Sequence, residues 1–189
     1  MDSLFPGLQA MPNIHPVLVH FPIAFLLGAL GVEALAVWRR REEWHRAAVV
    51  LLYLGAVGAV AAATSGWLAA ETVEHNDAAH EVMDLHETIM LWTTSLAVGL
   101  AVIAFVGGRY LETRPDGRPY GRSLQLFLLA GLLVVNLMLV VGADRGGQLV
   151  YEFSTGVQQP AMPAEGVPGE PAPAEPTPAP AEHQHDHEH

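Results

Sequence analysis

Cysteine is absent from this chain of 189 residues. Its absence excludes disulfide bonds, thiolate metal sites, iron–sulfur clusters and covalently attached c-type haem. Any metal bound by the chain must therefore be held by histidine, methionine or carboxylate side chains.

Charge is scarce as well, since only 15% of the residues are charged and 51% are hydrophobic. The apolar residues gather in four runs, at 14–38, 47–70, 86–108 and 124–143. Each run is close to the ~20 residues that a helix needs to cross ~30 Å of hydrocarbon. This pattern predicts an all-α integral membrane protein, an up-down bundle of four transmembrane helices. The formal charge of -11 excludes nucleic acid as a sensible partner.

The first apolar run is expected to remain in the mature protein. A signal peptide would begin with a positively charged region, but residues 1–13 contain no Arg or Lys, and three further apolar runs follow the first. Lysine is also absent, so all nine basic residues are arginines. Eight of them lie in two loops, Arg39, Arg40, Arg41 and Arg46 after the first run and Arg109, Arg114, Arg118 and Arg122 after the third.

This distribution predicts the orientation in the membrane. The positive-inside rule places both arginine-rich loops in the cytoplasm and both termini outside it. We therefore expect a multi-pass protein of the bacterial inner membrane, with Arg145 as the single basic residue on the outer side.

Four segments are predicted along the chain: an outer N-terminal segment at 1–13, the transmembrane domain at 14–143, an outer segment at 144–158 and a tail at 159–189. Gly146 and Gly147 permit a sharp turn that would fold the GGQLVY segment back on the bundle. The Pro/Ala/Glu-rich tail is expected to be disordered. No convincing internal repeat is visible.

Histidines gather at the outer ends of the first and third runs. His15 and His20 open the first run, and His80 and His86 open the third. Ionisable side chains in membrane helices are costly, which makes them candidates for function. Matching by depth pairs His20 with His86 and His15 with His80 across the diagonal of the bundle. A b-type haem on the deeper pair, with Arg145 near a propionate, is one interpretation. A non-haem metal and plain helix-to-helix hydrogen bonds are the others.

Other polar and small residues allow two interpretations each. The tail ends in His183, His185, His187 and His189, which either capture copper or zinc or are silent. Small residues recur every four positions in the second run, as in Gly58, Ala62 and Gly66, and serve either helix packing or a flat cofactor. The side chain of Glu33 is expected to reach Arg39 or the membrane interface. His45 is the single histidine on the inner side. Asn136 either makes a hydrogen bond across helices or is a minor polar insert.

The segment HPVLVHFPIAFLL, at 15–27, resembles the opening of an uncharacterised bacterial membrane family, domain of unknown function 2231. The segment GGQLVY at 146–151, with Gly156 and Val157, is similar to that family's closing motif, and His86 resembles its recurring histidine in the third span. Phe153 and Ser154 stand where a His-Gly sequence often occurs in the family. The resemblance implies a four-helix membrane domain and brings no established activity.

Three functions remain open at this point. The first is a non-catalytic or electron-carrying membrane subunit that holds one haem b between His20 and His86 and serves a redox protein or membrane complex. The second is a protein that handles copper or zinc on the outer face, and the third is a structural subunit without cofactor. Hydrolase and kinase chemistry have no support, because the chain lacks a nucleophile–base pair, a phosphate loop and an HExxH helix.

Overall fold

The computed structural model describes Leu4, Met11 and residues 13–71, 77–112 and 121–155. Its helices are α2 (His15–Leu18), α3 (His20–Arg39), α4 (Glu42–Ala70), α5 (Asp77–Glu112) and α6 (Arg122–Tyr151). Since α2 runs into α3 at Val19, these helices make four apolar spans that are long enough to cross a membrane. No strand occurs among the described residues, and the predicted all-α four-span fold is confirmed.

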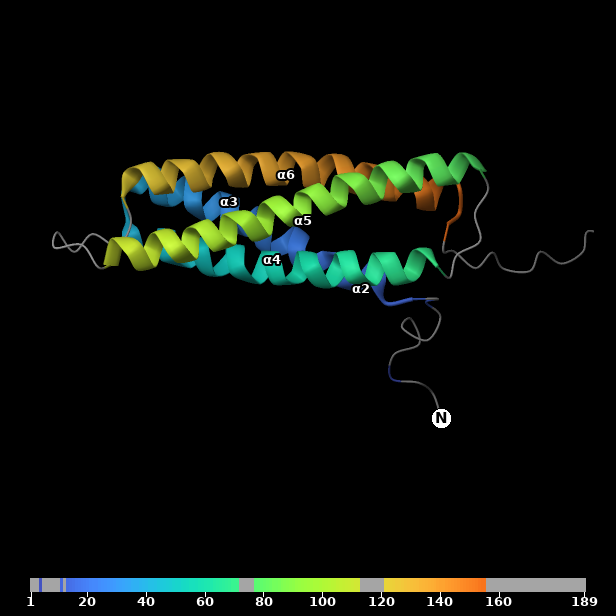
Figure 1. Ribbon diagram of the computed structural model, residues 1–189, viewed down its shortest axis with the longest axis horizontal. Helices are drawn as coiled ribbons and strands as arrows, with labels where there is room; N and C mark the ends of the chain where they lie inside the picture. Colours follow the sequence, from blue (N-terminus) through green and yellow to red (C-terminus); the bar gives the residue numbers. More distant parts are fainter. Residues whose placement is uncertain (1–3, 5–10, 12, 72–76, 113–120, 156–189) are drawn as a thin grey trace, which may run out of the picture. The chain divides into compact units, whose positions relative to one another are not determined.

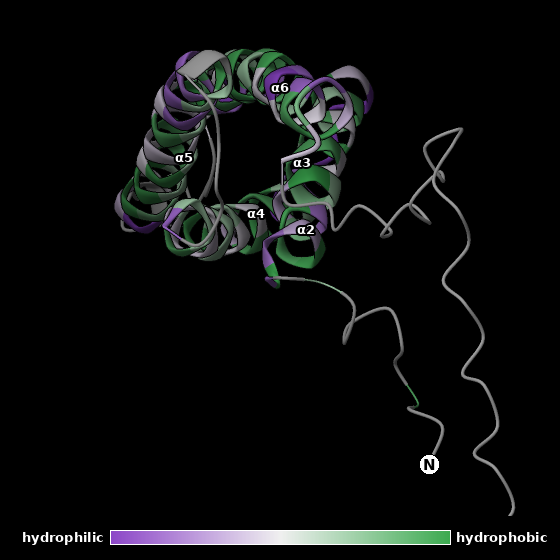
Figure 2. Ribbon diagram, turned by 90° about the vertical axis from the view of Figure 1, so that its right-hand side faces the viewer, coloured by the Kyte–Doolittle hydropathy of each residue, from purple (hydrophilic) through white to green (hydrophobic). Residues whose placement is uncertain are grey.

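The spans lie side by side with alternating direction (Figure 1) and form a four-cornered ring when seen from one end (Figure 2). α3 packs on α4 and α6, and α5 packs on the same two helices. The first and third spans are therefore diagonal partners, as expected for an up-down bundle.

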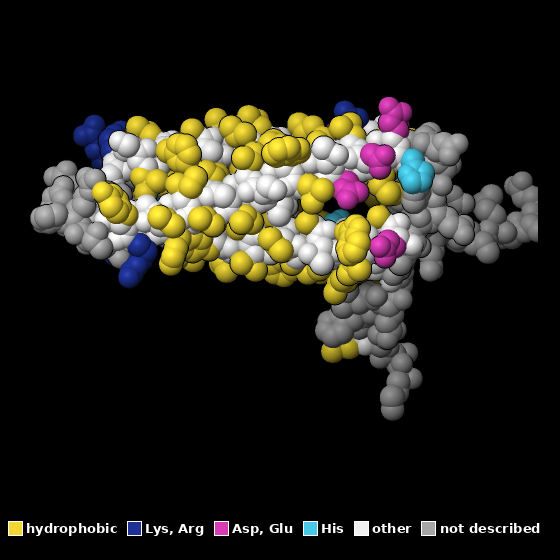
Figure 3. Space-filling model, in the orientation of Figure 1, with side chains coloured by type: hydrophobic (Ala, Val, Ile, Leu, Met, Phe, Trp, Pro, Cys, Tyr) yellow, Lys and Arg dark blue, Asp and Glu magenta, His cyan; other side chains and the backbone are white. Residues whose placement is uncertain are grey.

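Charged side chains separate to the two ends of the bundle, with apolar side chains between them (Figure 3). We call one end the arginine end, because it holds the described arginines Arg39, Arg40, Arg41, Arg46, Arg109 and Arg122. The other is the histidine end, where α2 and α5 begin and α6 finishes.

A two-residue connection joins α3 to α4 at the arginine end. Arg40 takes a left-handed conformation, with φ 53° and ψ 42°, and its backbone N–H donates to the carbonyl of Ala36. The N–H of Arg41 donates to the same carbonyl at 3.2 Å. This cap ends α3 abruptly, so α4 returns directly alongside it.

Small residues let α3 approach α4 closely. A Cβ atom built on Gly55 would lie 2.7 Å from Leu26, and one on Gly58 would lie 3.1 Å from the backbone nitrogen of Pro22. Further along, a Cβ on Gly66 would lie 2.9 Å from the ring of His15. Protein atoms thus fill the space along this stripe, which agrees with the helix-packing interpretation.

The two hairpins, α2–α3–α4 and α5–α6, bury many of their residues at the same spacing. α3 buries Pro22, Leu26, Ala29 and Glu33, and α5 buries Thr93, Ala97, Leu100 and Ala104. α4 buries Ala48, Leu52, Gly55, Ala56, Ala59 and Ala62, and α6 buries Leu128, Leu132, Val135, Asn136, Leu139 and Gly142. Equivalent helices run in the same direction and sit at opposite corners of the ring, so an approximate two-fold axis along the bundle relates the hairpins.

Large and small residues change places between the two hairpins. Leu26 packs on Gly55 in the first, where the equivalent positions of the second hold Ala97 and Val135. Leu100 packs on Gly131 in the second, where the first holds Ala29 and Leu51. This exchange keeps the core filled while it hides the repeat from sequence comparison.

Asn136 ties α6 to α3 deep in the bundle. It is 4% exposed, and its Nδ2 donates to the carbonyls of Leu26, at 3.2 Å, and Leu132, at 2.8 Å. The cross-helix bond that the sequence left open is therefore present.

The expected turn at Gly146 and Gly147 is wrong, because α6 continues through both glycines to Tyr151. Leu149 is 8% exposed and packs on the bundle as part of the helix. The physical reason is that backbone N–H and C=O groups near the membrane keep their partners by staying helical. The tail at 159–189 lies outside the described residues.

Replacement of Gly55 by Val should destabilise the bundle. The added carbon atoms would meet Leu26 within contact distance and force α3 away from α4. We expect a loss of about 1–3 kcal/mol, measured by thermal unfolding in detergent with circular dichroism. Gly31→Val is the matched control, since a Cβ there meets nothing within 4 Å. Equal losses in both variants would contradict the close-packing account.

Candidate histidine site

His15, the first residue of α2, turns its ring into the bundle against α4. Its Nδ1 lies 3.1 Å from the carbonyl oxygen of Ala62 and 3.0 Å from Oγ of Ser65. The Ser65 hydroxyl itself donates to Ala62 at 2.9 Å. The missing side chain of Gly66 makes room for the ring.

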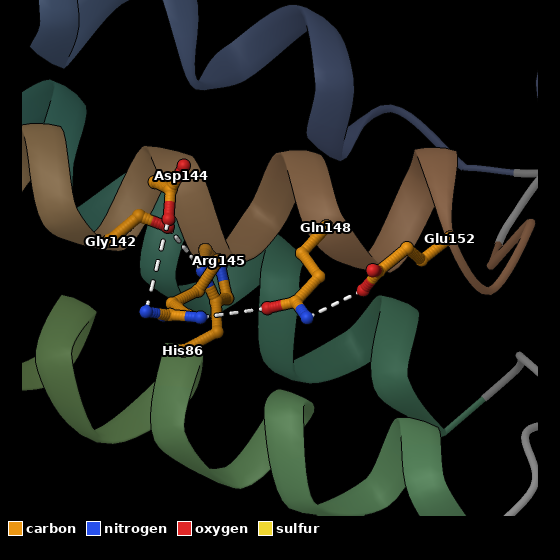
Figure 4. A network of polar contacts seen from close by, with 6 residues as sticks. All are labelled: His86, Gly142, Asp144, Arg145, Gln148 and Glu152. Atoms are coloured by element: carbon orange, nitrogen blue, oxygen red, sulfur yellow. Dashed lines mark hydrogen bonds and ion pairs between the residues drawn. The ribbon is translucent and has the colours of Figure 1, made fainter.

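His86 makes the equivalent arrangement between α5 and α6. Its Nδ1 lies 2.8 Å from the carbonyl oxygen of Gly142 (Figure 4), and a Cβ on Gly146 would lie 3.1 Å from its ring. In each hairpin, the histidine ring thus hydrogen-bonds one backbone carbonyl of the neighbouring helix and packs against the glycine four residues after that carbonyl. The two-fold relation of the core therefore extends to this site.

These contacts set the tautomer of both rings. A backbone carbonyl only accepts, so Nδ1 must carry the proton and donate it. For His15 the Ser65 oxygen is also an acceptor, because its own proton goes to Ala62. In the neutral ring, Nε2 then holds a lone pair, which is the arrangement found in histidines that ligate metals.

His15 and His86 stand on diagonal spans near the histidine end, and each ring bonds the neighbouring helix of its own hairpin. We call these two residues the histidine pair. Figure 3 shows a hollow between α4 and α5 near the histidine end, bordered by apolar and acidic side chains, with a histidine side chain at its base. The two histidines thus lie on diagonal spans at the same end of the bundle.

The expected pairing by depth joined His15 and His86 each to an exposed histidine. His20 and His80 are exposed on α3 and α5. In a helix, side chains five residues apart point about 140° apart, and side chains six residues apart point about 120° apart. His20 therefore points away from the direction of His15. His80 likewise points away from the direction of His86. Depth alone neglected this rotation. Within 13–71, 77–112 and 121–155, no group of three or more His, Asp or Glu side chains is arranged to hold a metal.

Arg145 precedes the glycine on which His86 lies. Its Nη1 donates to Gln148 at 2.8 Å, and Gln148 donates to Glu152 (Figure 4). Nε of Arg145 is buried and has no hydrogen-bond partner among the described residues. One guanidinium nitrogen is therefore available to an acceptor at the histidine end. The tail histidines His183, His185, His187 and His189 lie outside the described residues.

A second polar site lies near the arginine end, where the sequence interpretation was wrong. Glu33 does not reach Arg39 or the interface; it is 1% exposed and contacts His45, which is 0% exposed. Nδ1 of His45 lies 2.8 Å and 2.7 Å from the two carboxylate oxygens. We call these residues the Glu33–His45 pair.

The signal for this pair was present in the spacing. Glu33 continues the buried series of Pro22, Leu26 and Ala29, and His45 stands one turn before the buried Ala48 and Val49. If the buried faces of α3 and α4 both continue to the short connection between them, Glu33 and His45 lie next to each other. Arg39 does not continue that buried series, because it is exposed at the end of α3.

Removal of one partner of this pair should cost far more than removal of both. Glu33→Ala leaves His45 buried without its carboxylate, and such breaks cost about 3–5 kcal/mol. The double variant Glu33→Ala/His45→Gln copies Ala104 and Gln125, the equivalent residues of the second hairpin, and should recover most of that loss. Unfolding in detergent measures both. A double variant as unstable as the single one would contradict a pairwise interaction.

Comparison with known proteins places the chain in a family. The family described as "Predicted membrane protein (DUF2231)" matches residues 11–159, which include all four spans and both polar sites. No curated protein and no solved structure matches the chain. The chain belongs to the DUF2231 family of predicted membrane proteins.

Proposed function

We propose that this protein is a membrane subunit that carries electrons on one haem b, ligated by Nε2 of His15 and Nε2 of His86. The observation that carries the proposal is the common setting of the two rings. Each donates Nδ1–H to a backbone carbonyl of the neighbouring helix and lies on a glycine. Such a bond orients an imidazole and raises its basicity as a ligand.

Haem suits a site with two histidines from diagonal spans. A structural zinc site needs about four protein ligands, whereas His15 and His86 would be enough to hold a haem, which would supply one-electron chemistry. The approximate two-fold axis of the bundle relates these two residues. His20 and His80, which face outward, have no part in the revised ligand set.

The chain's own groups would tune such a cofactor. Haem supplies one-electron chemistry when bound, and the surrounding apolar helices exclude water from it. The buried Nε of Arg145 stands one residue from Gly146 and offers a donor to a propionate. Pro22, beyond the histidine pair along α3, is buried against Gly58 and keeps that part of the hairpin closed.

The location supports transfer to a partner outside the cytoplasm. The arginine end carries six described arginines, and the positive-inside rule assigns that end to the cytoplasm of a bacterial inner membrane. The histidine end then faces outward, where a soluble redox protein or a membrane complex would exchange electrons with the haem.

An optical spectrum tests the haem directly. Protein purified in detergent from haem-supplied cells should show a Soret band and a reduced-minus-oxidised α-band. His15→Ala and His86→Ala should each abolish these bands, whereas His20→Ala and His80→Ala should keep them. Circular dichroism must show equal helix content in all four variants.

Two results would contradict the proposal. One is a folded wild-type protein that stays colourless, and the other is loss of the bands in His20→Ala but not in His15→Ala. Stoichiometric copper or zinc in a colourless sample, found by elemental analysis, would favour the metal-handling function instead.

The absence of cysteine makes the orientation easy to test. Single-cysteine variants Ser154→Cys and Glu43→Cys place one exposed thiol near each end of the bundle. A membrane-impermeant maleimide should label Ser154→Cys in intact spheroplasts, and Glu43→Cys only after permeabilisation. The reverse labelling pattern would show that the histidine end faces the cytoplasm.

A further inference from the structure

The Glu33–His45 pair lies too far from the histidine pair to belong to the same site. Glu33 stands eighteen residues after His15 along the first span, a rise of about 27 Å at 1.5 Å per residue. Both side chains are fully enclosed, and both carboxylate oxygens face the same ring nitrogen. Nothing in the proposed haem chemistry uses them.

Packing alone does not require an ionisable pair at this position. In the second hairpin, the equivalent residues are Ala104, which is 0% exposed, and Gln125, which is half-buried. The second hairpin thus packs the equivalent position without a buried charge. Buried ion pairs seldom stabilise a protein more than apolar residues of similar volume, and ionisable groups in membrane spans commonly mark function.

We propose that the Glu33–His45 pair is a proton-binding site that exchanges one proton with the solvent at the arginine end. The loaded pair is neutral and consists of the Glu33 carboxylate with a His45 imidazolium. On unloading, one ring proton leaves to water and no other bond changes. His45 keeps the proton on Nδ1 and still donates it to Glu33, so the hydrogen bond survives in both states.

The loaded pair has no net charge, and the unloaded pair is negative. The charged side chains at this end come from all four spans. They are Arg39 and Arg40 at the end of α3, Arg41 and Arg46 with the acids Glu42 and Glu43 at the start of α4, Arg109 on α5 and Arg122 on α6. Six cations against two anions leave this end net positive, which partly offsets the burial of a negative pair.

Access to solvent follows from the position of His45. It is the fourth residue of α4 and follows the exposed residues Arg41, Glu42, Glu43 and Trp44. One helical turn therefore separates the ring from water. A proton taken up here enters the bundle from the side opposite to the histidine pair.

The Glu33–His45 pair stands apart from the proposed haem, because about 27 Å of helix rise separates Glu33 from His15. The proton site itself does not depend on haem.

Nitrogen NMR of protein labelled with ¹⁵N-histidine tests the site in detergent. One histidine should change from two protonated ring nitrogens to one between about pH 5 and 9, and should keep a hydrogen-bonded Nδ1–H throughout. Its signals should vanish in His45→Gln. Glu33→Gln should move the transition to lower pH, whereas the exposed Glu43→Gln should leave it within a few tenths of a pH unit.

A His45 signal that stays doubly protonated, or stays neutral, over this whole range would overturn the proposal. The wild-type titration decides the matter even if Glu33→Gln fails to fold. Since the NMR signal needs no haem, a colourless protein with a titrating His45 refutes the haem alone. A haem protein with a non-titrating His45 refutes the proton site alone.

Discussion

Hydrocarbon offers no hydrogen-bond partners, and this constraint governs every polar group inside the bundle. Most backbone groups meet it through helix bonds, and α6 meets it by continuing through two adjacent glycines. Side chains in the interior meet it across helices. His15 and His86 bond backbone carbonyls of neighbouring helices, Asn136 bonds Leu26, and Glu33 bonds His45. Each of these polar residues therefore lies where two helices approach closely enough for a hydrogen bond between them.

Close approach depends in turn on small residues. Gly55, Gly58 and Gly66 admit Leu26, Pro22 and the ring of His15, and Gly131 and Gly146 admit Leu100 and the ring of His86. The two hairpins use this device at the histidine end in the same way. They differ at the arginine end, where the first buries a Glu–His pair and the second buries Ala104. A shared frame thus holds one symmetric site and one site that belongs to a single hairpin.

The two ends differ in their polar groups. At the histidine end, His15 and His86 each bond a backbone carbonyl and the described arginine is Arg145, and our haem proposal rests on these groups. At the arginine end, the Glu33 carboxylate bonds the His45 imidazole among arginines, and our proton-site proposal rests on that pair. Neither chemistry interferes with the apolar middle, which Leu26, Leu132 and Val135 fill.

The sequence by itself determined the number of spans, their length and their apolar faces, because the thickness of hydrocarbon and the scarcity of charge allow few alternatives. It also identified His15 and His86 as candidates, the diagonal placement of their spans, and the family. Only the tertiary structure decided which histidines turn into the bundle. Depth along a helix can be read from residue numbers, but direction depends on the rotation of each helix, which packing at glycines sets. The same rotation brought Glu33 to His45 instead of Arg39, since the short connection at Arg40 turns two buried faces toward each other.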